Sequence, residues 1–381
     1  MHLFQAMMVA MLLAGGMGVS VLGSVKVALA RRLKIDEARV GGLVSVFGFV
    51  MIPVILSAGF VTDHVGKRVV LIVGSLLLGA SLAGLAGART YVVALTSVLI
   101  MGAGWSMLIN VGNVLIPLAF PGILGSATNL ANTIFGLGAF LTPLACEFLI
   151  RRYSLAATLG LLAALSLVPA VLAPGVQLGA PGPAAGHAVA TGMSPGFGVL
   201  LHDPTMWLCG ISLFFYGPME ASLGAWATTY LGEQGTSEWG AARLLSAFWL
   251  SFMASRLTAA LFFPSGWETT LLVTLAVSSI AVLLGMVRVR GPALASTAVI
   301  AAGLVFGPIF PTLMAVLLGH TNPSLHGRAV GLMFALGGIG WTAIPILIGI
   351  YSRRAGVRRG IIVVAGAALG LGATTLALAA L

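Results

Sequence analysis

Between two long apolar runs the chain reads Gly59-Phe60-Val61-Thr62-Asp63-His64-Val65-Gly66-Lys67-Arg68. Gly59 permits close packing of the preceding helix on its neighbours, because it has no side chain. Asp63 can cap a helix N-terminus or pair with a cation. Gly66 allows a tight turn, and Lys67 and Arg68 stay in the aqueous phase. A charge network of this kind can hold one conformation and release it when two halves of a protein move.

Apolar residues dominate the rest of the chain. Of its 381 residues, 59% are hydrophobic and only 7% are charged, and the mean hydropathy is +1.10. A soluble domain carries about 25% charged residues, so these charges could not cover a soluble surface of this size. The composition therefore predicts a polytopic membrane protein.

Twelve apolar runs approach the length of a transmembrane helix, about 20 residues. We place them near 5–30, 41–62, 69–88, 91–118, 122–149, 155–174, 205–231, 240–262, 267–288, 292–318, 327–351 and 359–380. Residues 175–203 are rich in Gly and Pro and lack Lys and Arg, which predicts a flexible linker ending in a short interfacial helix from Phe197 to Leu201. The predicted bundles are therefore 1–174 and 204–381.

An internal repeat supports this division. Gly136-Leu137-Gly138, Pro143 and Arg151-Arg152 are matched 202 residues later by Gly338-Ile339-Gly340, Pro345 and Arg353-Arg354. Gly16, Leu22 and Gly23 are matched 201 residues later by Gly217, Leu223 and Gly224. The sequence predicts an all-α fold of twelve transmembrane helices, arranged as two pseudo-symmetric six-helix bundles.

Several function classes are excluded. The net charge of +10 does not indicate nucleic-acid binding, because no basic stripe with interleaved aromatics accompanies it. The two cysteines, Cys146 and Cys209, are too few for a disulfide framework or a cysteine-ligated metal site. No metalloprotease, serine–histidine or phosphate-loop motif is present, so we expect no enzyme, no cofactor and no metal. The N-terminus has no basic segment or cleavage site, so we expect the first span to be retained.

The loop at 59–68 resembles the signature of the major facilitator superfamily, Gly-x-x-x-Asp-Arg-x-Gly-Arg-Arg/Lys, with His64 in place of the first Arg. The second half is similar to the fucose–proton symporter-like branch of sugar permeases. That similarity is carried by Tyr216-Gly217-Pro218-Met219-Glu220-Ala221-Ser222-Leu223-Gly224-Ala225-Trp226, by Gly307-Pro308-Ile309-Phe310-Pro311-Thr312, and by Gly331 with Gly337-Gly338-Ile339-Gly340. The resemblance implies a transporter whose bundles close alternately around a site between the first, fourth, seventh and tenth spans.

The chain departs from this branch at its coupling acids. The branch associates proton coupling with an Asp in the first span and a Glu in the fourth, whereas here neither span contains an acid. The fold and a preference for a small polar solute carry over, and the fucose chemistry does not.

Three charged residues in predicted spans are candidates for a functional role, because charges within a membrane usually face the protein interior. Glu220 is the only acid near the middle of a span, and an apolar site lets a carboxyl carry protons near neutral pH. Its alternative role is helix packing. Lys26 is a candidate for binding an anionic substrate or pairing with Glu220, or it reaches the interface. In the branch, an Arg at the place of Arg256 belongs to the gating network, so we group Arg256 with Gly59, Asp63, Gly66, Lys67 and Arg68.

Neutral side chains complete the predicted substrate site. Amides exchange hydrogen bonds with hydroxyls, and aromatic rings can stack on a sugar. The candidates are Asn110, Asn113, Asn129, Asn132, Tyr216, Trp226 and Phe310, with Lys26. Interhelical packing is the alternative for each of them.

We therefore predict a secondary transporter of a small polar solute, sugar-like or an organic anion, with proton coupling through Glu220 as a hypothesis. The alternatives are an exporter of amphipathic or drug-like compounds and a transport-inactive solute sensor. We expect a monomer in the lipid bilayer of a bacterial inner membrane. The sequence leaves open the solute, the direction of transport and the coupling ion.

The distribution of charge conflicts with the expected orientation. The resemblance places the N-terminus and the 59–68 loop in the cytoplasm. The outer loops would then hold 14 cations and the cytoplasmic loops three: Lys67, Arg68 and Arg328. The positive-inside rule would invert this arrangement.

Overall fold

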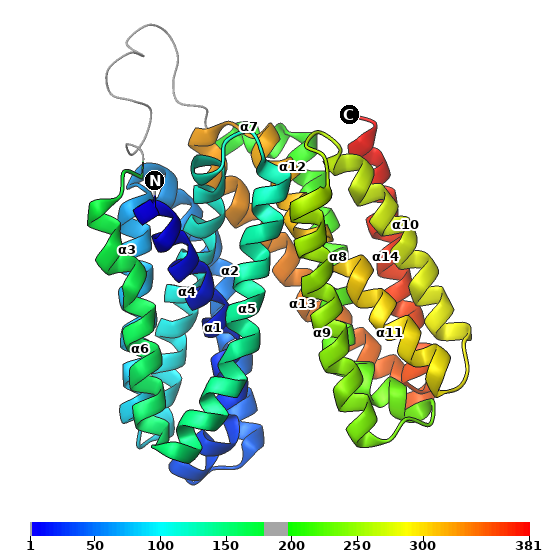
Figure 1. The fold of residues 1–381 in the computed structure, drawn as a ribbon, viewed down its shortest axis with the longest axis horizontal. Coiled ribbons are helices and arrows are strands. Elements are labelled where there is room, and N and C mark those ends of the chain that lie inside the picture. Colours follow the sequence, from blue (N-terminus) through cyan, green and yellow to red (C-terminus); the bar gives the residue numbers. More distant parts are fainter. Residues whose placement is uncertain (1, 179–196) are drawn as a thin grey trace, which may run out of the picture. The chain divides into compact units, whose positions relative to one another are not determined.

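The computed structural model describes residues 2–178 and 197–381, and within these ranges every regular element is a helix (Figure 1). The long helices of the first half are α1 (His2–Leu33), α2 (Glu37–His64), α3 (Lys67–Gly87), α4 (Tyr91–Ala119), α5 (Leu124–Arg152) and α6 (Leu155–Leu172). Those of the second half are α8 (Pro204–Glu233), α9 (Glu238–Phe262), α10 (Glu268–Arg288), α11 (Pro292–Phe306), α12 (Ile309–His320), α13 (His326–Ala355) and α14 (Val357–Ala379). Short elements are η1 (Ala173–Gly175), α7 (Phe197–His202) and η2 (Pro323–Leu325).

These helices confirm the predicted fold class. Among the described residues, ten segments are long and apolar enough to cross a membrane, and α11 with α12 forms one of them. The long helices α8 and α13 occupy the positions of the seventh and eleventh predicted spans. The short helix expected at Phe197 is present as α7. One feature was not predicted: the tenth span is interrupted between Phe306 and Ile309.

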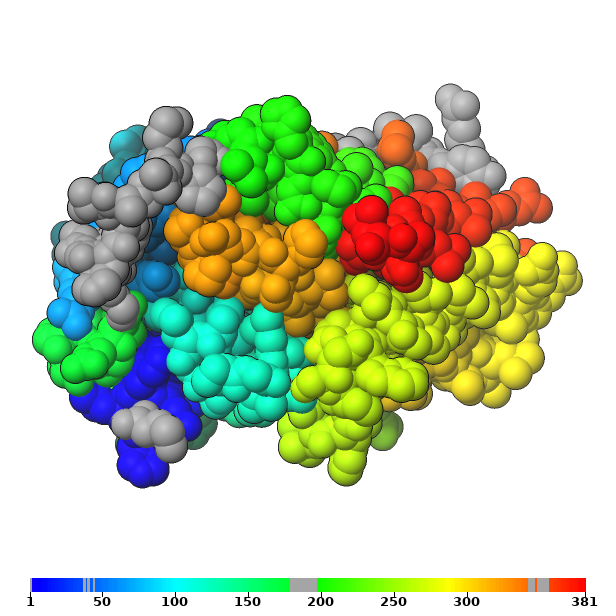
Figure 2. All heavy atoms as spheres, turned by 90° about the horizontal axis from the view of Figure 1, so that it is seen from above, coloured from blue at the N-terminus to red at the C-terminus, as the bar shows by residue number. Residues whose placement is uncertain are grey.

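Most helix boundaries repeat along the chain. α3 and α10 begin and end 201 residues apart, and so do α4 and the α11–α12 pair. α6 and α14 begin 202 residues apart, as do α5 and α13. Equivalent helices also make equivalent contacts in the two halves. α3 packs on α6 as α10 packs on α14, and α2 packs on α4 as α9 packs on α11. Figure 2 shows the C-terminal end of α14 (red) beside the start of α10 (yellow-green).

The chain forms two compact units, which we describe separately. Unit 1 contains Met1–Pro121, Ile134–Phe197 and Asn322–Leu332; unit 2 contains Gly122–Thr133, Gly198–Thr321 and Met333–Leu381. The first turns of α5 therefore belong to unit 2 and those of α13 to unit 1. Most of the predicted 175–203 linker lies outside the described residues, and the division at 1–174 and 204–381 stays a prediction.

Glycine brings equivalent helices together in each unit. A side chain at Gly138 of α5 would collide with the backbone of α1 at Leu13, and one at Gly340 of α13 would collide with the backbone of α8 at Phe214. Gly138 and Gly340 belong to the repeat seen in the sequence. The repeat therefore preserves the positions where two backbones touch, as small residues do in membrane helix packing.

Candidate functional site

Asp63, at the end of α2, is the centre of a buried charge network in unit 1. Its Oδ1 accepts the backbone N–H of Gly327 at 2.8 Å, and its Oδ2 accepts the N–H of Arg328 at 3.0 Å. The Arg328 Nε also donates to Oδ2, at 2.9 Å. Both side chains are at most 9% exposed. Asp63 therefore caps the N-terminus of α13 and neutralises the arginine beside it.

Neighbouring residues complete this network, which we call the Asp63 latch. The Asn110 amide donates to the Gly327 carbonyl at 2.9 Å and accepts from the Thr62 hydroxyl at 2.9 Å. A side chain at Gly59 would collide with the Gly327 backbone. The fully buried Asn110 thus lies in the latch, with its amide nitrogen and oxygen both engaged.

The turn after α2 holds the remaining residues of the predicted gating motif. Gly66 has φ +107°, a conformation that favours glycine, and it precedes the first residue of α3, Lys67. Arg68 donates to the Val176 carbonyl at 2.6 Å. His64 is exposed and contacts the Phe60 carbonyl of its own helix through Nδ1.

A second polar cluster lies in unit 2, at the break between α11 and α12. Pro308 has no N–H to donate, and a residue before proline is disfavoured in a helix, so the helix stops at Phe306 and restarts at Ile309. Two backbone carbonyls at the break accept side-chain donors. The Tyr216 hydroxyl lies 3.1 Å from the Phe306 carbonyl, and the Arg256 Nε donates to the Gly307 carbonyl at 2.7 Å.

Glu220 joins this cluster through Tyr216. The Tyr216 hydroxyl lies 2.9 Å from the Glu220 Oε2, one helical turn along α8. Arg256 interacts electrostatically with both groups, is 5% exposed, and packs over the Phe252 ring at 4.3 Å. A buried arginine is thus hydrogen-bonded to the helix break and lies near enough to an acid to interact with it electrostatically.

The amides of α5 adjoin the same cluster within unit 2. The Asn129 Nδ2 donates to the Gly125 carbonyl at 2.9 Å and approaches the Thr312 hydroxyl at 3.4 Å. Its Oδ1 is buried and has no partner among the described residues. The Asn132 carbonyl accepts from Arg256 at 3.4 Å. One buried amide oxygen therefore remains available to a donor.

The other predicted residues are more dispersed. Phe310 contacts Phe334, which stacks on Trp341. Asn113 donates to the Ile109 carbonyl of its own helix at 2.9 Å, and Trp226 is half-buried. Lys26 is half-buried in α1. Glu147 and Arg151 form an exposed ion pair at 2.7 Å on α5. Within the described ranges no three His, Cys, Asp or Glu residues gather as a metal site would require.

A family model for the Major Facilitator Superfamily matches residues 7–345. The chain belongs to this superfamily. Its members are transporters, and the family and fold are typical of non-enzymatic, multi-pass membrane proteins. The fold of this transporter also matches solved structures across nearly its whole length.

Two solved structures illustrate the likeness. The Escherichia coli fucose:proton symporter FucP is 18% identical, with a TM-score of 0.80 over 97% of this chain and 98% of that one. The human organic anion transporter MFSD10 (TETRAN) is 17% identical, with a TM-score of 0.73 over 98% and 97%. A curated relative, "Bypass of stop codon protein 6" of Saccharomyces cerevisiae, is 30% identical over 179 residues, or 44% of this chain and 36% of that protein. The match spans little more than a third of the length of this relative.

Sequence reasoning missed three parts of these sites. The cation of the Asp63 latch is Arg328, whereas Arg256, which we had grouped with Asp63, has its partners at the helix break. The sequence did offer a sign of this pairing, because Arg328 lies at the start of the eleventh predicted span, on the same predicted side of the membrane as Asp63. The break between α11 and α12 could have been predicted from Gly307-Pro308, because proline disfavours a continuous helix. Nothing in the sequence marked Thr312 as a neighbour of Asn129.

Proposed function

We propose that this transporter moves a small polar solute, sugar-like or an organic anion, by alternating access, and that Glu220 couples the movement to protons. The observation that carries the proposal is the bond from Tyr216 to both Glu220 and the Phe306 carbonyl at the helix break. A carboxyl that is linked through a hydroxyl group to a break in a helix can transmit its protonation state to the backbone.

The proposed coupling mechanism follows from the single proton on the Tyr216 hydroxyl. The hydroxyl has one proton, and both of its neighbours are acceptors when Glu220 is ionised. In that state Tyr216 can satisfy either Glu220 or Phe306. When Glu220 is protonated, it donates to the Tyr216 oxygen, and Tyr216 donates to the Phe306 carbonyl, so every group is paired. Protonation of Glu220 therefore favours the hydrogen-bonded break, and deprotonation releases it.

The surrounding side chains suit a polar solute. The unpartnered Asn129 Oδ1 offers an acceptor to a hydroxyl or N–H group, and Phe310 provides an aromatic face. Arg256 offers a cation that would favour an organic anion. The names of FucP and MFSD10, a fucose:proton symporter and an organic anion transporter, agree with these two solute classes.

The Asp63 latch fits the gating part of the proposal. Three hydrogen bonds to Asp63 join the end of α2 to the start of α13. The bonded residues are 264 or 265 positions apart in the sequence. Breaking it exposes a buried carboxylate and a buried guanidinium, so the latched state is favoured until other contacts replace it. We propose a bacterial inner membrane and a monomer as the setting.

The test is solute flux into proteoliposomes with and without an inward pH gradient. Wild-type protein is first screened with neutral sugars and organic anions. For the solute that is moved, uptake driven by the pH gradient should be at least about tenfold lower in Glu220→Gln than in wild type. Exchange of solute without a gradient should persist. Glu147→Gln, which changes an exposed acid on α5, is the matched control and should behave as wild type.

The outcomes separate the alternatives. Glu220→Gln vesicles that respond fully to the pH gradient would refute proton coupling through this residue. Flux confined to amphipathic compounds would favour the exporter, and solute binding without any flux would favour the sensor.

A further inference from the structure

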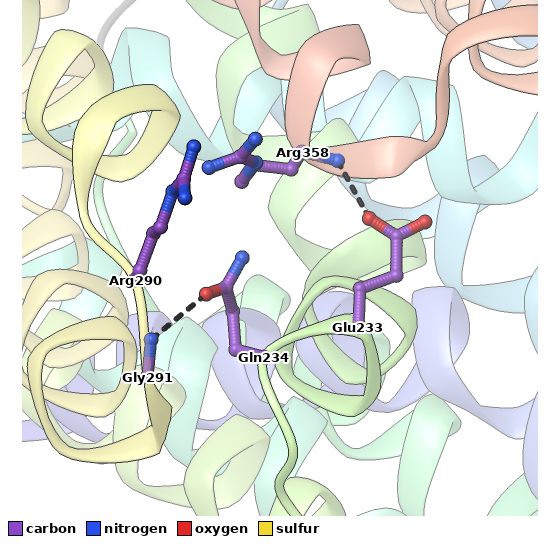
Figure 3. Close-up of a pocket in the computed structure, with 5 residues that line it drawn as sticks. All are labelled: Glu233, Gln234, Arg290, Gly291 and Arg358. Atoms are coloured by element: carbon purple, nitrogen blue, oxygen red, sulfur yellow. Dashed lines mark hydrogen bonds between the residues drawn. The ribbon is translucent and has the colours of Figure 1, made fainter.

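The arginines at one end of unit 2 are not used by the proposed transport site. The C-terminus of α8, the α10–α11 connection and the α13–α14 connection all lie at this end, and they surround a cavity of about 360 Å³. Its lining is Glu233, Gln234, Arg290, Gly291 and Arg358 (Figure 3). Thirteen residues of α8 separate Glu233 from Glu220, or roughly 20 Å along the helix, so this cavity is a separate site.

The cavity brings two cations together. Figure 3 shows the guanidinium groups of Arg290 and Arg358 pointing towards each other over the cavity, from the α10–α11 connection and from α14. No ion pair is found for either side chain among the described residues. Like charges facing each other are unfavourable unless an anion lies between them, and paired guanidiniums match the oxygens of a phosphate.

The acid in the lining does not supply that anion. Glu233 Oε1 accepts the Val357 N–H at 2.8 Å and Oε2 accepts the Arg358 N–H at 2.9 Å, so the carboxylate caps the N-terminus of α14. Gln234 likewise accepts the Gly291 N–H at 3.1 Å, and Figure 3 shows its amide nitrogen on the side of the two guanidiniums. The three lining acceptors therefore bond to backbone, and the free donors face the cavity.

We propose that this cavity binds a phosphate group, held by Arg290 and Arg358 with the Gln234 amide. Its position suits a phospholipid headgroup, because α8, α10, α11 and α14 all end or begin there and the apolar helices stop at this level. A soluble phosphate offers the same chemistry. Arg290 and Arg358 belong to the excess of outer-loop cations that conflicts with the positive-inside rule, and the proposal gives these two a ligand.

Purified full-length protein tests this in two arms. In neutral phosphatidylcholine nanodiscs, inorganic phosphate is titrated at constant ionic strength and the melting temperature is followed. In the second arm, native mass spectrometry counts the phosphatidylglycerol molecules retained from mixed micelles. The test variant is Arg290→Gln/Arg358→Gln, which leaves the backbone cap on Glu233 intact. The control is Arg243→Gln/Arg359→Gln, which removes the same charge from exposed positions at the same end.

Binding in either arm that weakens about tenfold or more in the test variant and stays near wild type in the control supports the site. A response to phosphate identifies a soluble anion, and a response only to lipid identifies a headgroup. Equal losses in both double variants would mean diffuse electrostatic attraction and would overturn the proposal. No binding in either arm would also overturn it.

Discussion

The first and fourth spans meet in unit 1 as the seventh and tenth meet in unit 2, but the hydrogen bond between them runs in opposite directions. In unit 1 the Trp105 indole of α4 donates to the Gly15 carbonyl of α1 at 2.7 Å. In unit 2 the Tyr216 hydroxyl of α8 contacts the Phe306 carbonyl of α11. Gly15 and Tyr216 are 201 residues apart, and so are Trp105 and Phe306.

This reversal changes what each unit can do. In unit 1 the side chain comes from an unbroken helix, and the bond only joins two helices. In unit 2 the side chain comes from α8, beside Glu220, and the acceptor lies at a helix break. The positions equivalent to Glu220 and Arg256 in the first repeat are Val19 and Ile55, which carry no charge. The same contact is structural in one unit and chemically responsive in the other.

Among the variants that test this contrast, Arg256→Met has the largest expected effect. The change leaves Glu220 without its local cation and the Gly307 carbonyl without its donor, so we expect a loss of about 3–5 kcal/mol in the free energy of unfolding. Denaturant unfolding in detergent measures it. The equivalent Ile55→Met should cost less than about 1.5 kcal/mol.

A double variant distinguishes charge from packing. If the cost comes from the uncompensated acid, adding Glu220→Gln to Arg256→Met should recover a large part of it. Additive losses would show that the cost comes from the contacts of Arg256 with the Phe252 ring and the Gly307 carbonyl, and not from the charge of Glu220.

The next test compares the two acids near interhelical turns. Asp63→Asn removes the charge that caps α13 and faces Arg328, and we expect a loss of about 2 kcal/mol or more. In unit 2 Glu268 lies against the first turn of α5 near Gly125, with no hydrogen bond among the described residues. Glu268→Gln should cost less than about 1 kcal/mol, because it removes only a helix-end charge. Melting curves of the two variants under one condition decide this, and equal losses would contradict the asymmetry.

The hydrogen bonds themselves give a smaller effect. Tyr216→Phe and Trp105→Phe each leave a buried carbonyl without its side-chain donor, at about 1–2 kcal/mol. Both should lower the melting temperature of the protein. Only Tyr216→Phe should also reduce uptake driven by a pH gradient, because only that hydroxyl contacts Glu220. Equal effects of both variants on driven uptake would remove the functional distinction between the units.

The smallest effect belongs to the turns. Gly66 precedes α3 with φ +107°, and Gly266 lies in the equivalent turn before α10 with φ +88°. Alanine at either position should cost about 1 kcal/mol from the backbone conformation. Open space surrounds Gly266, so its cost measures conformation without collision. If Gly66→Ala lowers the free energy of unfolding several times more than Gly266→Ala in the same assay, the additional loss comes from disturbing the Asp63 latch.

Composition and spacing determined the class of this protein by themselves. Long apolar runs can bury their backbone polar groups in lipid only as helices, so the twelve spans followed from hydropathy. The repeat at Gly138 and Gly340 followed because backbone contact needs glycine at fixed positions. The 59–68 motif and the acid at Glu220 were also visible, since charges are rare in such a chain.

Only the tertiary structure decided which of these residues act together. Asp63 and Arg328 are 265 residues apart, and hydropathy says nothing about which helix ends meet. Asn110 looked like a substrate ligand and lies in the latch, while Arg256 looked like a latch residue and lies at the helix break. A polar side chain takes whatever partner the packing of apolar faces brings within hydrogen-bond distance, and that partner is set by the fold and not by the sequence nearby.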